Sequence, residues 1–362
     1  MTYSSFSEFI RQKKILIVLG AGGVGKTSCS VGLAAKAASM GQRVALLSID
    51  PAKRLAQALG IPLGSELKPV DLSKLVYDSG VQFGRLDACM LDQKIVFDQM
   101  VYRYAPSRSI AEKILKDKLY QSASNKLAGS LEYMALAKLQ DIVDSQSYDL
   151  IVLDTPPDTQ ALDFLKKPNV LDGFMENNVM TWLVKPFYVA SKIGFEKFFK
   201  MGEKLMGGLA KITGFGALKT FSEFLILIQN VIEGFHKASE RVVKTLLEEK
   251  TSFALICTPK ESSLQSARSM MEELGRLHYA FDFFIWNKCL PPKIVESFSF
   301  VSEEEKNSYS ALAHLAERVR EENSAKLEMA PYTKGLFCQE LYESPQALHE
   351  FEALSDFVRM FK

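Results

Sequence analysis

The sequence lacks both a strong charge imbalance and a metal-binding pattern of cysteine or histidine. Its 44 lysine and arginine residues are matched by 43 aspartate and glutamate residues, which leaves a formal net charge of +1. No overall field therefore draws the chain to nucleic acid or to anionic lipid. The five cysteines include no CxxC pair, and the four histidines are isolated. We therefore expect neither a zinc site nor a disulfide framework.

Long apolar runs are also missing. The sequence contains no span of about 18 uncharged apolar residues, the kind of segment that crosses a membrane. The first residues, MTYSSFSEFIRQKK, hold no apolar core of signal-peptide length. We therefore expect a cytoplasmic protein. The length of 362 residues suffices for one large α/β domain with an insertion, or for two modest domains.

Short apolar runs alternate with helix-like stretches along much of the chain. The strands that these runs predict are 15–19, 43–49, 148–154, 253–257, 281–286 and 327–329. The expected helices are 27–40, 52–59, 161–165, 264–277, 303–322 and 346–361, together with a helical interval at 93–144. Continuous apolar strands that alternate with helices indicate an α/β fold with a mostly parallel sheet and helices on both faces.

The interval 174–250 differs from its surroundings because it contains no convincing strand. Its apolar residues recur at helical spacing, so we interpret the chain as a single domain, 1–362, with a helical insertion at 174–250. Phenylalanine-rich stripes, lysines and methionines suit three roles for this insertion. It could be a bundle that packs on itself and the sheet, an adaptable groove for a hydrophobic client or membrane-protein partner, or a basic helix lying on a membrane.

One glycine-rich turn carries the clearest chemical signal. GAGGVGKT, residues 20–27, fits the phosphate-loop pattern G-x-x-x-x-G-K-[ST] and stands between an expected strand and an expected helix. Glycines let backbone N–H groups curl around phosphate oxygens, and the helix start favours negative charge. In this pattern Lys26 reaches the β- and γ-phosphates and the Thr27 hydroxyl holds Mg²⁺. A dinucleotide-binding turn with Asp50 as ribose partner is an alternative, but it gives Lys26 and Thr27 no role.

Two aspartates stand at the ends of expected strands. Asp50 follows the strand at 43–49, and Asp154 closes the strand at 148–154. Since open α/β sheets bind ligands at the carboxyl ends of their strands, both side chains should face the phosphates. One can hold the water shell of Mg²⁺, while the other orients or deprotonates the attacking water. Asp50 could instead cap the following helix, and Asp154 could be a turn residue.

Asn287, which follows the strand at 281–286, is the candidate for base recognition. A guanine-binding motif reads Asn-Lys-x-Asp, but Leu290 stands at the position of the aspartate. Without that carboxylate to accept hydrogen bonds from guanine, we expect adenine. The alternative for Asn287 is a turn residue at the end of a strand.

Taken in order, these motifs resemble the ArsA-like family, the arsenical pump-driving ATPases and their relatives that target tail-anchored membrane proteins. The quoted features are GGVGKT, DPA at 50–52, DTPP at 154–157, Asn287 and Pro331, and the resemblance covers most of the chain. It implies a P-loop ATPase that uses ATP and Mg²⁺. It also implies closure around nucleotide as a homodimer, or as a heterodimer with a related subunit. The expected partner is a membrane protein or a hydrophobic client, and any membrane association would run through that partner.

The same resemblance implies roles for single residues. The nucleotide would be held by Gly22, Gly23, Val24, Gly25, Lys26, Thr27 and Ser28 of the loop, with adenine held by Asn287 and a loop at Pro331. The catalytic residues would be Lys26, Asp50 and Asp154, and the Mg²⁺ residues Thr27, Asp50 and Asp154. Glu132 lies in a segment, LAGSLEYMALAKL, that is similar to one in a bacterial branch of the family, and it would face the partner subunit.

Ala21 departs from the family, whose members usually carry a lysine there. That lysine reaches the nucleotide of the other subunit and neutralises charge that develops in phosphoryl transfer. Three explanations stay open. Lys53 or Arg54 could supply the charge, a lysine-bearing sister subunit could supply it, or hydrolysis could be slow.

Two other functions also stay open. The first is a nucleotide-gated scaffold with little hydrolysis, which Ala21 favours. The second is a positioning ATPase of the ParA/MinD kind. The long helical insertion argues against this second function, as does the weak positive charge of the C-terminal segment FEALSDFVRMFK.

Overall fold

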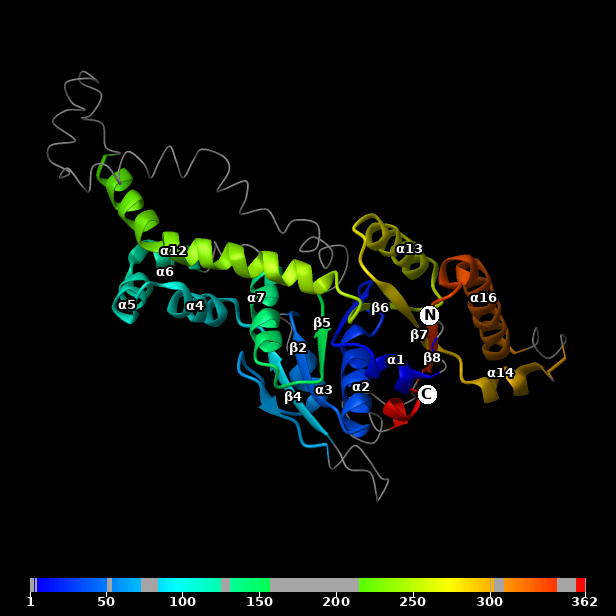
Figure 1. The fold of residues 1–362 in the computed structure, drawn as a ribbon. Helices are drawn as coiled ribbons and strands as arrows, with labels where there is room; N and C mark the ends of the chain where they lie inside the picture. Colours follow the sequence, from blue (N-terminus) through cyan, green and yellow to red (C-terminus); the bar gives the residue numbers. More distant parts are fainter. Residues whose placement is uncertain are drawn as a thin grey trace. The chain divides into compact units, whose positions relative to one another are not determined.

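The computed structural model describes residues 3, 5–50, 54–72, 84–124, 131–156, 215–299, 301–302, 309–343 and 356–361. They divide into two compact units, whose helices and strands are labelled in Figure 1. The first unit is drawn from 1–92, 138–166 and 243–362, and the second from 93–137 and 167–242.

A mostly parallel sheet forms the centre of the first unit. Its strands are β1 (Ile15–Gly20), β2 (Arg43–Ser48), β3 (Lys68–Pro69), β4 (Arg85–Met90), β5 (Leu150–Asp154), β6 (Thr251–Cys257), β7 (Phe281–Cys289) and β8 (Phe337–Tyr342). Their order is β3-β4-β2-β5-β1-β6-β7-β8, and only β3 pairs antiparallel with its neighbour (Figure 1). The predicted α/β class is therefore confirmed.

The central strand β1 is buried on both faces. Leu16 and Val18 join a core cluster with α1 (Phe6–Arg11) and α2 (Lys26–Ser39), while Ile17 on the opposite face is also fully buried. A strand of this kind cannot expose either face to water, so both faces need cover. The remaining helices of this unit are α3 (Arg54–Leu59), α13 (Glu261–Arg276), α14 (Pro292–Ser299) and α16 (Ser310–Thr333).

Five of the six predicted strands are confirmed, but the strand at 327–329 is wrong. Those residues belong to α16, in which Glu322, Ala325 and Met329 are buried at helical spacing while Leu327 is 76% exposed. Pro331 therefore lies inside a helix, not in a loop that follows the last strand. A short apolar run fits a buried helix segment as well as a strand, which explains the error.

Strands β3, β4 and β8 were not predicted. β4 is hidden in the sequence by two polar residues, Arg85 and Asp87. Asp87 is nevertheless fully buried, because the Tyr148 hydroxyl donates to it at 2.6 Å and Arg85 Nε donates at 2.9 Å. The expected helices at 27–40, 52–59 and 264–277 correspond to α2, α3 and α13. The expected helix at 161–165 and most of the one at 346–361 lie outside the described residues.

The second unit is helical where it is described. It contains α4 (Gln93–Tyr104), α5 (Arg108–Lys116), α6 (Lys118–Ser124) and most of α12 (Phe215–Leu246), and α7 (Leu131–Asp144) begins in it. Phe224 and Val231 of α12 share a core cluster with residues of the other helices, namely Val101, Ala111, Ile114 and Tyr120. The expected helical interval at 93–144 is confirmed in its described parts. The insertion bounds 174–250 stay a prediction, since 174–214 lie outside the described residues.

Replacing Gly32 with alanine should destabilise the first unit. A Cβ at Gly32 of α2 would lie 2.8 Å from ring atoms of Phe357 and Phe361, and overpacking of this kind costs about 1–3 kcal/mol. Gly275→Ala in α13 is the matched control, because its Cβ would meet nothing within 4 Å and alanine favours the helix by up to about 1 kcal/mol. In urea unfolding, the free energy of unfolding should fall below that of wild type in Gly32→Ala and rise above it in Gly275→Ala. Equal stability of the two would show that the Phe357 and Phe361 rings are not fixed over α2.

Candidate functional site

The phosphate loop joins the end of β1 to the start of α2. Gly23 and Gly25 have φ angles of 77° and 93°, in the left-handed region that favours glycine. Gly25 also directly precedes α2, and a Cβ at this position would clash with the amide of Asn287. Backbone conformation and close packing therefore both require glycine at position 25.

Lys26, the first residue of α2, turns its side chain back over the loop. Its buried ammonium donates to the carbonyl oxygens of Gly20 at 2.8 Å and Ala21 at 2.9 Å. A buried charge needs such partners, because burial without them is costly. The amine thus lies at the loop and at the positive end of the helix, where a phosphate would bind.

Asp154 lies fully buried at the end of β5. Ser30 Oγ donates to its Oδ1 at 3.2 Å, Ser48 Oγ donates to its Oδ2 at 2.9 Å, and the Thr27 hydroxyl is a third partner. Burial raises the pKa of Asp154 to about 6, although these hydroxyls and Lys26 work in the opposite direction. A carboxylate beside a threonine hydroxyl is an oxygen donor set that suits Mg²⁺.

Asp50 lies two residues after the end of β2 and is also buried, but it has a different partner. Arg54 Nη1 of α3 lies 2.9 Å from its Oδ2 in an ion pair. From the sequence, Lys53 or Arg54 could supply the positive charge that a lysine at position 21 would bring to the nucleotide. In this structure the guanidinium of Arg54 lies against Asp50, while Lys53 is outside the described residues.

Two neighbouring side chains near the end of β7 contact the loop. Asn287, only 4% exposed, donates from Nδ2 to the Val24 carbonyl at 2.7 Å. Lys288 Nζ donates to the Gly23 carbonyl at 2.9 Å. Asn287 was predicted as a nucleotide residue, and the structure brings it to the loop. Lys288 was missed, although the Asn-Lys pair was visible in the sequence.

A small cavity lies against the loop. Its volume is about 150 Å³, and its lining includes 21–24 of the loop, Ser263, Lys260 and Lys288. Ala21 therefore shares this cavity with two lysines that come from other segments. Such a volume is far smaller than the pockets that enclose whole drug-sized ligands, so only part of a nucleotide would fit in it.

The other predicted residues are not placed at the site. Pro331 lies in α16, so the adenine loop expected around it is absent from that position. Glu132 belongs to α7, but its side chain is outside the described part of the structure, as is Pro157 of the DTPP segment. Their roles stay predictions.

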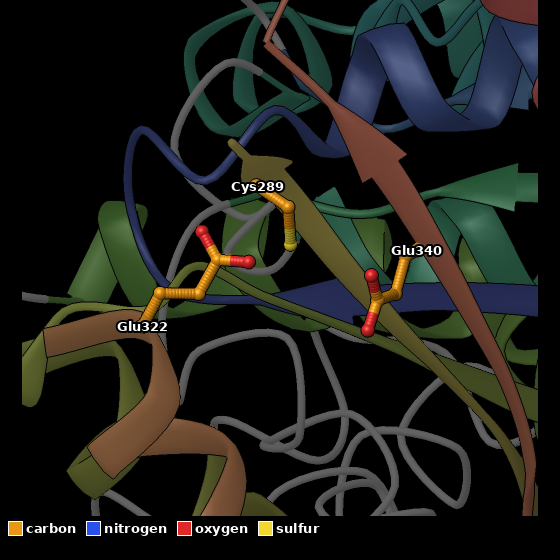
Figure 2. A group of neighbouring side chains, drawn as sticks. All are labelled: Cys289, Glu322 and Glu340. Carbon is orange, nitrogen blue, oxygen red and sulfur yellow. The ribbon is translucent and has the colours of Figure 1, made fainter. Parts of the chain in front are cut away.

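Among the described residues, three side chains have possible ligand atoms close enough to share a metal ion, all within 4.8 Å of one another. Figure 2 shows Cys289 of β7, Glu322 of α16 and Glu340 of β8 pointing toward one another. Lys326 Nζ already lies 2.9 Å from Glu322 and 2.7 Å from Glu340, and these bonds raise the pKa of Lys326 despite its burial. Burial also raises the pKa of the Cys289 thiol, whereas metals bind the thiolate. We interpret the group as an ion-pair cluster.

Comparison with known proteins places most of the chain in one family. The profile of the family described as "Anion-transporting ATPase" (ArsA_ATPase) matches residues 13–334. The protein "ATPase get3" of Botryotinia fuckeliana is 26% identical over 279 residues, which cover 77% of this chain and 73% of that protein. "ATPase ASNA1 homolog 1" of Paramecium tetraurelia is 26% identical over 285 residues, 77% of this chain and 76% of that protein. Among the described residues, no helix combines the length and apolar character needed to cross a membrane.

Asp154→Asn should remove a pH dependence of stability in metal-free and nucleotide-free protein. Because burial raises the pKa of Asp154 to about 6, the folded chain holds this proton more tightly than the unfolded chain, whose value is near 3.8. Stability from this group is complete below pH 3.8 and is lost as the pH rises to about 6. The loss should amount to about 3 kcal/mol, at about 1.36 kcal/mol per pKa unit.

The measurement is urea unfolding in a chelator, compared between wild type and Asp154→Asn across this range. The free energy of unfolding of wild type should fall relative to that of the variant as the pH rises. A constant difference between the two would show that Asp154 ionises in the folded chain as it does in water.

Proposed function

Because the chain belongs to the anion-transporting ATPase family, and is thus an ATP-binding ATPase, we propose that it hydrolyses ATP with Mg²⁺ and couples hydrolysis to a partner. Closure of a dimer around nucleotide would change the conformation of the second unit, which is helical. This unit would engage a membrane-associated partner or a hydrophobic client. The relatives' names identify ATPases and give no client for this chain.

The observation that carries the proposal is the placement of Lys26, Thr27 and Asp154. Lys26 lies over the loop carbonyls at the head of α2, and Asp154 is buried beside the Thr27 hydroxyl. The pair Thr27 and Asp154 would hold Mg²⁺, which when bound supplies positive charge against the phosphate oxygens. Lys26 would stabilise the negative charge of the transferring phosphoryl group.

Asp50 is the residue that we assign to the attacking water. It follows β2, a strand that pairs with β5, so both aspartates belong to the carboxyl ends of adjacent strands. Arg54 Nη1 contacts the Asp50 carboxylate at 2.9 Å. A buried carboxylate at this position can orient water and accept its proton.

For the base, we propose adenine. Asn287 reaches the site from β7, and Leu290 still stands where a guanine-binding aspartate would be. For the assembly, we propose a homodimer or a heterodimer with a related subunit, with Glu132 facing that subunit. We propose a cytoplasmic location, with any attachment to a membrane made through the partner.

The helical unit offers one observation about the partner site. Phe224 and Val231 of α12 face Val101, Ile114 and Tyr120, so this side of α12 is covered by the chain itself. That packing supports a bundle in which the described part of the insertion packs on α4, α5 and α6 of the same unit. A client groove would then have to lie elsewhere in 174–250.

A scaffold with little hydrolysis is the second candidate, and Ala21 is the observation that favours it. Its small side chain cannot supply the positive charge that a lysine would bring to the nucleotide of another subunit. A measurement of ATP turnover distinguishes the hydrolysing ATPase from the scaffold.

Asp50→Asn should abolish turnover without abolishing ATP binding. Removing a general base typically costs about 100-fold or more in rate, while the phosphate contacts of the loop remain. The measurement is ATPase activity per subunit against protein concentration. The matched control is Asp149→Asn, an exposed ion-pair partner of Arg43 at the opposite end of β5. It should leave the activity unchanged.

A rise of wild-type activity per subunit with concentration would support a homodimeric ATPase. Negligible turnover at every concentration, with ATP still bound, would favour the scaffold or a dimer with a related subunit. Full activity in Asp50→Asn would refute the role given to Asp50.

A further inference from the structure

We propose that Lys288 is a positioning residue of the phosphate loop, which acts with Asn287 to orient the backbone amides that bind phosphate. This role presupposes the ATPase function proposed above. Lys288 would not touch the reacting atoms. It would fix the loop that does.

Two adjacent carbonyl groups of the loop accept hydrogen bonds from β7. Asn287 Nδ2 donates to the carbonyl oxygen of Val24 at 2.7 Å, and Lys288 Nζ donates to that of Gly23 at 2.9 Å. In a planar trans peptide the C=O and the following N–H point in opposite directions. Holding these two carbonyls toward β7 therefore turns the N–H groups of Val24 and Gly25 away from β7. We assign this orientation to the binding of phosphate oxygens, which backbone N–H groups bind in this motif.

The backbone conformation of Lys288 also supports a role in positioning the loop. Its φ angle is 60°, in the left-handed region that lysine rarely adopts. The pairing of β7 with β8 is irregular between Trp286 and Cys289, so Asn287 and Lys288 form the irregular step. Local strain of this kind persists only where surrounding contacts over-determine it, and it often occurs at functional sites.

Contacts of the two residues that follow hold this irregular backbone in place. The Leu290 N–H donates to Glu322 Oε2 at 2.8 Å, and the Glu343 N–H donates to the Cys289 carbonyl at 2.9 Å. Glu322, which is drawn in Figure 2, is itself paired with Lys326 Nζ at 2.9 Å. The end of β7 is thus anchored to α16 and β8, and from this anchor it reaches the loop.

Loss of the Lys288 amine should weaken nucleotide binding without weakening the fold. We expect Lys288→Met to raise the Kd for ATP and for ADP, each with Mg²⁺, about tenfold, which corresponds to the loss of one charge-assisted hydrogen bond. KM for ATP should rise by a similar factor, with kcat changed less than about twofold, since the residue acts on binding.

Three further variants separate positioning from simple structural support. Lys288→Gly removes the amine and also relieves the left-handed strain, so it should weaken binding while the urea midpoint of the nucleotide-free protein does not fall. Lys288→Arg keeps a donor and should retain most of the affinity. Lys293→Met removes an exposed lysine of α14 that is not part of the cavity lining, and it should leave the affinity within about twofold.

Calorimetric titration with Mg²⁺ and ATP or ADP tests the set. Unchanged affinity in Lys288→Met and Lys288→Gly would overturn the proposal, as would an affinity loss accompanied by an equal fall in the urea midpoint. Failure of the wild-type protein to bind ATP would instead refute the proposed function, which keeps the two failures distinct.

Discussion

Parallel pairing of β1 with β5 on one side and β6 on the other is the constraint from which the site follows. The register places Val18 beside Asp154 and Gly20 beside Ile256, so the phosphate loop and the buried carboxylate emerge at the same edge of the sheet. Because these strands are buried along their whole length, polar chemistry can appear only where they end. The apolar sheet thereby concentrates Lys26 and Asp154 at one edge.

The loop itself depends on donors that satisfy its carbonyl groups. Lys26 of α2 donates to those of Gly20 and Ala21. From β7, Asn287 donates to that of Val24 and Lys288 to that of Gly23. A glycine-rich segment loses much conformational entropy when it is ordered, so these fixed contacts offset part of that cost before nucleotide binds. The loop is therefore preformed by side chains from α2 and from β7, which is more than 260 residues away in the sequence.

The sequence was informative where local pattern decides structure. β1, β5 and β6 are continuous apolar runs, and the loop has a pattern in which nearly every residue has a defined role. β4 was missed because burial of Asp87 depends on Tyr148, a distant partner. The segment 327–329 was mistaken for a strand, since its helical periodicity becomes clear only over the longer span from Glu322 to Met329. Lys288 was missed because its left-handed turn is imposed by β8 and α16, which no local pattern encodes.

The central claim is that this loop binds ATP through its backbone and Lys26. Titration of the chain with ATP and Mg²⁺ in a calorimeter, for wild type and Lys26→Met, tests it most directly. Wild type should bind one ATP per chain, and the variant should lose most of this affinity while the urea midpoint of its nucleotide-free form changes little. Equal binding by the two proteins, or no binding by wild type, would contradict it.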